Sequence, residues 1–187
     1  MDRDLVVQAQ RGDLGAFEAL ATSSHPRLFR VALGILRDAD RAEDATQATM
    51  VDVWRYLPRL RDPQAFDSWS YRLLVRACSR EARDVPRRLP EIEIGSRPAP
   101  PAADTIAGVA DRDQLERGFR RLSVEHRAVI VLRYLMDLPH DRIAEALDIA
   151  PGTVGSRLNR AMGALRAAIE ADDRPAPALA QAREADR

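Results

Sequence analysis

The residues best suited to binding chemistry are arginines, and they concentrate in two short segments. All 29 basic residues are arginine, and 29 acidic residues balance them. Six arginines lie between Arg72 and Arg88 with only two acids, and three lie between Ile149 and Ile169 with none. Guanidinium groups bind phosphates and guanine edges. The two segments are therefore candidates for contacting nucleic acid, with a solvated arginine face as the alternative, and the net charge of +0 excludes a uniformly basic nucleic-acid-binding protein.

Residues for catalysis or metal binding do not come together in the sequence. His25, His126 and His140 are scattered, without metal-ligand spacing or a cysteine partner, and each is expected at the surface. The sequence contains no phosphate-binding loop, no nucleophile elbow and no carboxylate pair in a recognisable setting. We expect no catalytic residue, no metal and no cofactor.

Cysteine use and hydropathy bear on the compartment. Cys78 is the only cysteine, so an internal disulfide cannot form, which favours a reducing cytoplasm. The N-terminus is charged, and no apolar run approaches the roughly 18 residues of a membrane span. The sequence predicts a cytoplasmic protein without membrane insertion.

Proline marks the boundary between two folded parts. Five of the 12 prolines fall between Val85 and Ala102, where no helix can run because proline lacks the amide and clashes with the preceding turn. We expect a first domain over 1–85, a linker over 86–110, a second domain over 111–172 and a disordered tail over 173–187.

The apolar residues of both parts recur at helical spacing. Stripes at intervals of three and four residues begin at Leu28, Met50, Leu73, Leu115 and Val154, and no long run alternates with period two. Met50, Trp54 and Leu57 form one such stripe, as expected for a buried helix face. The predicted fold class is all-α: two small helical domains joined by a proline-rich linker, the C-terminal one a helix-turn-helix.

The helix-turn-helix prediction rests on residues 138–165. A short helix carries Ile143, Ala144 and Leu147, the turn is 148–150, and a second helix starts near Pro151, where proline costs nothing. In such motifs the second helix enters the DNA major groove. Its polar and cationic residues are the candidates for contacting DNA, and an ordinary solvated face is the alternative. They are Thr153, Ser156, Arg157, Asn159 and Arg160.

Residues 115–169 resemble the C-terminal promoter-recognition domain of bacterial sigma factors, in their extracytoplasmic-function (ECF) group. The resemblance rests on the segments R-x-V-x-x-L-R-Y from Arg127, I-A-x-x-L from Ile143, and G-T-V-x-S-R-L-x-R-A from Gly152. It implies that the second helix contacts the minus-thirty-five promoter element.

Three positions depart from the family pattern. Gly155 replaces a usual Lys or Arg, Pro139 replaces a usual Ser cap, and Asp148 occupies a turn position often held by Gly. Aspartate tolerates a left-handed backbone better than most residues. These departures bear on the promoter sequence more than on the fold.

Residues 5–84 resemble the other conserved domain of the same family. The segment from Asp40 to Gln47, followed by Trp54, is similar to the helix that docks on the clamp of the polymerase's largest subunit. The resemblance assigns polymerase binding to Asp40, Glu43, Asp44 and Gln47. Acids also favour helix N-termini, so a solvated helix start is the competing explanation.

The helix beginning at Phe66 resembles the promoter-melting and minus-ten segment of the family. Its candidate DNA contacts are Arg72, Arg76, Arg80 and Arg83, and Arg76 stands where Asn is common. Trp69 and Tyr71 cannot both face DNA, and Trp69 is expected in the core. Relatives capture a flipped base with the preceding loop, here roughly 57–66.

The resemblance implies an alternative, ECF-type sigma factor that binds core RNA polymerase and promoter DNA, with an anti-sigma factor as a further partner. It implies no catalysis. Two alternatives stay open from the residues: a transcriptional regulator that uses the helix-turn-helix with a sensing N-terminal domain, and a degenerate sigma factor that binds partners without opening DNA.

Overall fold

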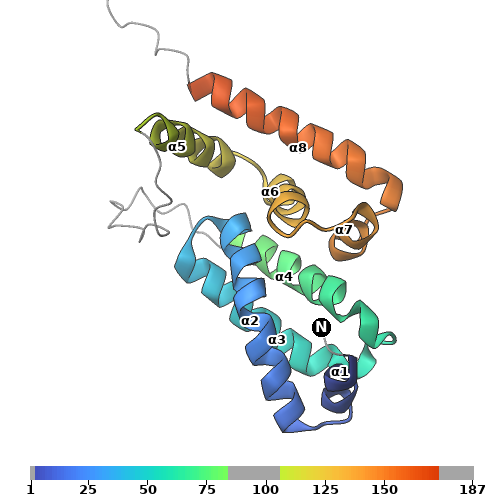
Figure 1. Ribbon diagram of the computed structural model, residues 1–187. Helices are drawn as coiled ribbons and strands as arrows, with labels where there is room; N and C mark the ends of the chain where they lie inside the picture. The colour runs from blue at the N-terminus through green and yellow to red at the C-terminus, as the bar shows by residue number, and fades with distance from the viewer. Residues whose placement is uncertain (1–2, 84–105, 173–187) are drawn as a thin grey trace, which may run out of the picture.

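The computed structural model describes residues 3–83 and 106–172, and the regular structure of these residues is helical throughout (Figure 1). The all-α prediction is confirmed. The main helices are α1 (Arg3–Gln10), α2 (Leu14–Leu36), α3 (Ala39–Tyr56), α4 (Phe66–Arg83), α5 (Ile106–Arg120), α6 (Val124–Ile130), α7 (His140–Leu147) and α8 (Pro151–Asp172).

Helices α1 to α4 form the first domain, and aspartates fix where its long helices begin. The side chain of Asp13 accepts a hydrogen bond from the Ala16 amide at 2.9 Å, and Asp38 accepts one from the Arg41 amide at 2.9 Å. Such caps satisfy amides that have no partner in the first turn of a helix. Buried residues such as Leu28 and Leu74 then hold α2 against α4.

Helices α5 to α8 form the second domain, in which α8 lies across the other three (Figure 1). A π-helical turn (Val131–Leu135) extends α6 and leads to α7. Gly118 permits the close crossing of α5 and α8, because a Cβ atom there would lie 2.8 Å from Cγ1 of Ile169. Ile143 and Val154 are fully buried between α7 and α8.

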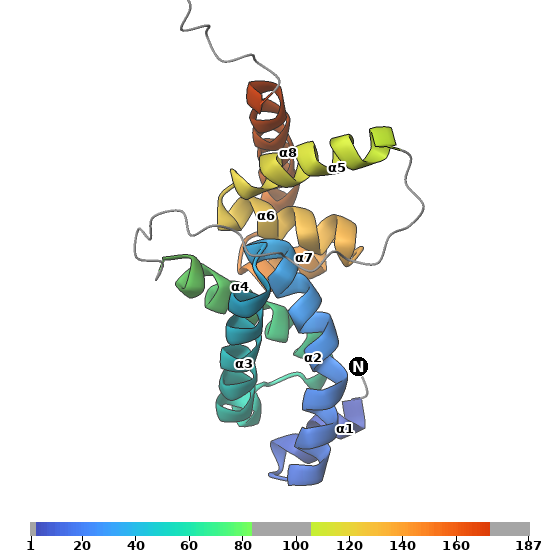
Figure 2. The same cartoon turned by 90° about the vertical axis from the view of Figure 1, so that its left-hand side faces the viewer.

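The two domains pack directly on one another. One cluster of buried apolar residues runs from α2 and α4 into α6, α7 and α8, and both views place α4 beside α7 (Figures 1 and 2). Gly34 of α2 permits the close approach of the second domain, because a Cβ atom there would lie 3.0 Å from Val131. Arg37 at the end of α2 pairs with Glu116 of α5.

The linker predicted over 86–110 extends too far at its C-terminal end. Helix α5 begins at Ile106, so the last residues of that range are helical. The stretch lacks prolines after Pro101, and the periodicity signal there is too weak to place the helix start from the sequence. The rest of the predicted linker and the predicted tail, 173–187, lie outside the described residues.

Candidate nucleic-acid and polymerase interfaces

The turn between α7 and α8 has the backbone geometry of a helix-turn-helix. Asp148 caps α7 in the left-handed conformation (φ 55°, ψ 49°), and the Ile149 amide donates to the Ala144 carbonyl at 3.0 Å. Helix α8 starts at Pro151, as predicted. Pro139 is the N-cap of α7 and supplies no side-chain hydrogen bond, which is the expected consequence of losing a serine cap.

The buried residues of α8 determine which side faces solvent. Val154, Ala161 and Leu165 point into the core. The predicted contact residues lie on the remaining surface: Ser156, Asn159 and Arg160 are exposed, and Thr153 and Arg157 are partly buried at its edges. The Ser156 hydroxyl donates to the Thr153 carbonyl at 3.0 Å, and Arg160 Nε donates to the Ser156 carbonyl at 3.3 Å. The five residues therefore form one polar, cationic surface.

Helix α4 carries the predicted minus-ten arginines in a single stripe. Arg72, Arg76, Arg80 and Arg83 follow one another at intervals of three and four residues, which places them on one side of the helix. Arg80 pairs with Asp52 of α3 at 3.3 Å, and Arg83 Nε donates to the Ser79 carbonyl at 3.1 Å. Arg72 and Arg76 instead face the second domain.

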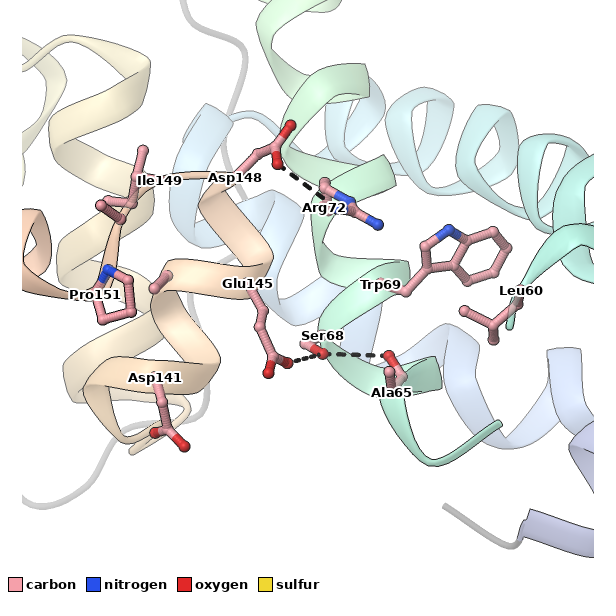
Figure 3. Close-up of a pocket in the computed structure, with 12 residues that line it drawn as sticks. Leu60, Ala65, Ser68, Trp69, Arg72, Asp141, Glu145, Asp148, Ile149 and Pro151 are labelled. Atoms are coloured by element: carbon pink, nitrogen blue, oxygen red, sulfur yellow. Dashed lines mark hydrogen bonds and ion pairs between the residues drawn. The ribbon is translucent and has the colours of Figure 1, made fainter. Parts of the chain in front are cut away.

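Arg72 and Arg76 both pair with Asp148, the cap of α7. Arg76 Nη2 lies 2.9 Å from Asp148 Oδ2, and Arg72 Nη1 lies 3.6 Å from Asp148 Oδ1. One turn earlier, the Ser68 hydroxyl donates to Glu145 Oε2 at 2.6 Å (Figure 3). A cavity of about 500 Å³ lies along this contact, lined by both α4 and α7. Sequence analysis did not find these pairs, because each joins residues more than 70 positions apart.

Beside the stripe, α3 and α4 enclose a groove of about 400 Å³ that combines aromatic and cationic side chains. Tyr56 and Trp69 line it together with Arg76 and Arg80. Aromatic faces stack unpaired bases while arginines hold the backbone, so the groove suits single-stranded nucleic acid. Tyr56 was missed from the sequence because it belongs to α3, at the end of a helix predicted to bind protein.

Trp69 and Tyr71 lie on different sides of α4, as their spacing predicts. Tyr71 is buried, and Arg27 lies over its ring at 5.1 Å. Burial raises the pKa of the Tyr71 hydroxyl. Trp69 is partly buried: it packs against the second apolar cluster and also lines the groove. The core prediction for Trp69 is therefore correct for one side of its ring only.

The loop between α3 and α4 is held by hydrogen bonds from a side chain that lies far away in the sequence. Gln10 Nε2 donates to the Leu57 and Leu60 carbonyls at 3.1 and 2.7 Å. Asp62 caps the short turn before α4 by accepting from the Gln64 amide at 2.9 Å. The loop predicted to capture a base is therefore held in a defined shape, and Leu60 lies beside Trp69 (Figure 3).

The predicted polymerase-binding residues form the outer surface of α3. Asp40, Asp44 and Gln47 are exposed, and Glu43 is partly exposed. The Gln47 side chain donates to Glu43 Oε1 at 3.0 Å, and this hydrogen bond lowers the pKa of the Glu43 carboxyl. His25 Nε2 lies 3.3 Å from the same oxygen.

The same side of α3 continues into two exposed apolar residues, of which only Trp54 belongs to the pattern that resembles the docking helix. Val51 is 56% exposed and Trp54 is 46% exposed. The prediction that Trp54 belongs to a buried stripe is wrong in that respect, because Val53 takes the inward position and Trp54 packs edge-on against Phe17 at 4.6 Å instead. Acidic and apolar side chains thus share one continuous surface.

Two kinds of feature are not found among the described residues. Across 3–83 and 106–172, no three His, Cys, Asp or Glu side chains gather as a metal site would require. No helix in these ranges is long and apolar enough to cross a membrane.

Both halves of the chain match known protein families. Residues 20–88 match the family described as "Sigma-70 region 2", and residues 112–165 match "Sigma-70, region 4". The first range holds the α3 surface and the α4 stripe, and the second holds the helix-turn-helix.

Similar proteins cover most of the chain. The "ECF RNA polymerase sigma factor SigM" of Mycobacterium tuberculosis H37Rv is 32% identical over 88% of this chain and 82% of its own length. The "RNA polymerase sigma-H factor" of Pseudomonas aeruginosa is 25% identical over 90% of this chain and 94% of its own.

Two solved structures share the fold. The first, CnrH in complex with the cytosolic domain of CnrY, has a TM-score of 0.67 at 24% identity and covers 91% of this chain and 98% of its own. The second, the sigma factor RpoE with the anti-sigma factor NepR from Bartonella quintana, has a TM-score of 0.60 at 21% identity and covers 83% and 98%.

Proposed function

Because the chain belongs to the ECF group of sigma-70-like RNA polymerase sigma factors, and so binds core polymerase and directs promoter-specific initiation, we propose how its surfaces divide that work. Helix α8 contacts the minus-thirty-five element, α4 contacts the minus-ten element, and α3 contacts the polymerase clamp. The chain contributes no catalysis of its own and acts in the cytoplasm.

The observation that carries the minus-thirty-five assignment is the exposed polar surface of α8 on a helix-turn-helix. Arginine bonds to guanine in two places, asparagine suits adenine, and hydroxyl groups hold phosphates. Arg160 and Asn159 are exposed in the N-terminal half of the helix, and in such motifs the N-terminal part of the second helix enters the major groove. Arg157, Ser156 and Thr153 complete the contact surface.

The minus-ten assignment rests on the stripe of four arginines and the groove beside it. Arg72, Arg76, Arg80 and Arg83 hold the phosphate backbone, while Tyr56 and Trp69 supply faces for an unpaired base. Melting a promoter requires such stacking, since each exposed base loses its neighbours in the duplex. The loop before α4, fixed by Gln10, lies beside Trp69 through Leu60.

The polymerase assignment rests on the continuous outer surface of α3. Asp40, Glu43, Asp44 and Gln47 present acidic and amide groups to a basic helical partner, and electrostatic complementarity of this kind steers association. Val51 and Trp54 add an apolar part that a protein partner would bury. Exposed aromatic residues of this type are frequent energetic anchors of interfaces.

An anti-sigma factor is a further proposed partner. The solved relatives CnrH and RpoE are each in complex with another protein, and NepR is described as an anti-sigma factor. The shared fold supports the proposal of an equivalent partner for this chain, and binding experiments would identify it.

Run-off transcription with purified core polymerase on a library of promoter fragments tests the proposal. We expect specific start sites that depend on this chain. Core binding with no transcript from any fragment would favour a degenerate sigma factor. Absence of core binding would contradict the sigma assignment altogether and favour a regulator that uses the helix-turn-helix alone.

A further inference from the structure

We propose that a cavity at the junction of the two domains binds a small aromatic carboxylate, whose ring enters the cavity and whose acid group pairs with Arg37 and Arg112. The cavity has a volume of about 250 Å³ and is walled by α2, α5 and the end of α6 with its π-helical turn. None of its described lining residues belongs to α3, α4 or α8, which carry the proposed polymerase and promoter contacts. The inference therefore goes beyond the proposed function and does not depend on it.

The walls of the cavity are mostly apolar and include two aromatic rings. Phe119 of α5 and Tyr134 of the π-helical turn contribute the rings, and Leu115 and Leu135 lie beside them. Leu115 is 47% exposed and Tyr134 is 63% exposed, so a ligand in the cavity would cover apolar surface that water now contacts. The body of the ligand is therefore apolar, and the two rings favour an aromatic one.

The volume of the cavity limits the size of the ligand. An apolar cavity of about 150 Å³ accepts a benzene ring. The cavity between these domains, at about 250 Å³, has room for a bicyclic ring. A docked protein helix instead needs a groove with anchor points along several of its turns. The cavity thus fits a small molecule better than a helix of a protein partner.

The charged residues of the cavity suit an anion. Those that line it among the described residues are Arg37, Arg112 and Glu116. The one carboxylate of this set already serves two guanidinium groups, because Glu116 Oε1 accepts from Arg37 Nε at 2.9 Å and from Arg120 Nε at 3.2 Å. A second carboxylate, supplied by a ligand, would balance the excess of arginine with charge-assisted hydrogen bonds.

Arg37 is held in position before any ligand binds. It also pairs with the second carboxylate oxygen of Glu116, and its guanidinium group lies 5.6 Å from the centre of the Phe119 ring. Burial lowers the pKa of Arg37, and the positive charges of Arg120 and Arg112 lower it further. A ligand carboxylate would offset this repulsion, and a donor that is already ordered loses little entropy when it binds.

A ligand in this cavity contacts both domains at once. Arg37 belongs to the first domain, whereas Phe119 and Tyr134 belong to the second. A ligand that binds only the folded state raises the stability of that state with increasing concentration. The chain would therefore respond to the concentration of a small aromatic acid.

The test uses 2-naphthoate as the probe and 2-naphthamide as its neutral counterpart of the same size. Isothermal titration calorimetry with the full chain measures the affinity of both compounds. We expect 2-naphthoate to bind about tenfold more tightly, because the amide cannot form an ion pair with the arginines. The thermal unfolding midpoint should rise with the concentration of 2-naphthoate.

Two arginine variants locate the bound probe. Arg112 and Arg80 are both exposed and both line a hollow that combines arginines with aromatic rings, Arg112 in this cavity and Arg80 in the groove between α3 and α4. Arg112→Gln should weaken binding of 2-naphthoate about fivefold and leave binding of 2-naphthamide unchanged. Arg80→Gln, the matched control, should change neither affinity.

A third variant tests the apolar part of the cavity. Leu115 lines the cavity from an exposed position, so a larger side chain there can fill the cavity without displacing the core. Leu115→Trp should therefore weaken the binding of both compounds, in contrast to Arg112→Gln.

Three results would overturn the proposal. Equal affinities for 2-naphthoate and 2-naphthamide would show that the arginines do not bind the acid group. A loss of affinity in Arg80→Gln as large as that in Arg112→Gln would place the probe in the groove between α3 and α4 instead. No measurable binding at millimolar 2-naphthoate would exclude an aromatic carboxylate and leave a side chain of a protein partner as the occupant of the cavity.

Discussion

At the residue scale, the arginines of α8 carry the most direct test of promoter contact. Arg160→Ala should weaken binding of the polymerase holoenzyme to its promoter by about 1–3 kcal/mol, because a guanidinium that contacts a base edge contributes on that order. Arg166→Ala is the control, since it removes the same charge from an exposed position further along the helix. Electrophoretic mobility shift at fixed salt measures both. Equal losses of promoter affinity in the two variants would mean that binding depends on the overall charge of the helix and not on a base contact by Arg160.

Gln10 offers a residue-scale test of the loop before α4. Gln10→Ala removes two hydrogen bonds to the Leu57 and Leu60 carbonyls, and each such bond contributes about 1 kcal/mol. We expect chemical denaturation to show a loss of about 2 kcal/mol. Promoter opening, followed by permanganate reactivity of unpaired thymines, should fall further than promoter binding. Gln8→Ala on the same helix, at an exposed position, is the control.

Cys78 is the chain's one thiol, and burial raises its pKa to about 12. The folded state therefore keeps this proton at pH values where the unfolded chain has lost it. The resulting contribution to stability is complete below about pH 9 and is lost as pH rises toward 12. Urea unfolding of the unchanged chain should thus weaken more steeply over roughly pH 9–11 than that of Cys78→Ala. Parallel curves for the two proteins would exclude this linkage.

At the element scale, two helical glycines should respond in opposite directions to the same substitution. A Cβ atom added at Gly155 would have nothing within 4 Å, so Gly155→Ala should stabilise the protein by about 1 kcal/mol through helix propensity alone. In Gly118→Ala the new Cβ would lie 2.8 Å from Cγ1 of the stiff Ile169 side chain. Overpacking costs about 1–3 kcal/mol, which exceeds the propensity gain. Denaturant midpoints of both variants check the signs, and two stabilised variants would contradict the close crossing of α5 and α8.

The helices themselves were predictable because their signals are local. Apolar residues at intervals of three and four mark the buried face of α8, and Pro151 marks its start, so the helix-turn-helix followed from spacing alone. The same reasoning failed at Trp54, where Val53 is buried instead. A tryptophan at the edge of an apolar stripe can lie on the buried or on the exposed side of a helix. Here the contact with the Phe17 ring determines where the Trp54 side chain lies.

The candidate site was predictable residue by residue, whereas its pairings were not. The face of α4 that carries Arg72 and Arg76 follows from helical geometry. Their partner, Asp148, lies in the other domain and reaches them through the docking of α7 on α4. Gln10 likewise reaches its loop only through the fold of the first domain. Such contacts depend on tertiary arrangement, which no local pattern encodes.

At the scale of the whole molecule, Gly34 tests the packing of the two domains on each other without changing any charge. A side chain at this position must take space that Val131 and Leu135 occupy, since even a Cβ atom would lie 3.0 Å from Val131. Gly34→Leu should therefore destabilise the packing between the two domains by about 1–3 kcal/mol, while each domain keeps its helices. The radius of gyration from small-angle scattering should rise, with an unchanged helical circular dichroism signal.

Gly163→Leu is the matched control, because nothing lies within 4 Å of a Cβ atom there and the position faces solvent. Gly34 and Asp148 lie in different parts of the interface between the two domains. Gly34→Leu and Asp148→Asn together should therefore separate the domains more than either change alone. An unchanged radius in Gly34→Leu, with the protein still folded, would mean that the interface adapts to the larger side chain and that the packing of the domains does not depend on Gly34.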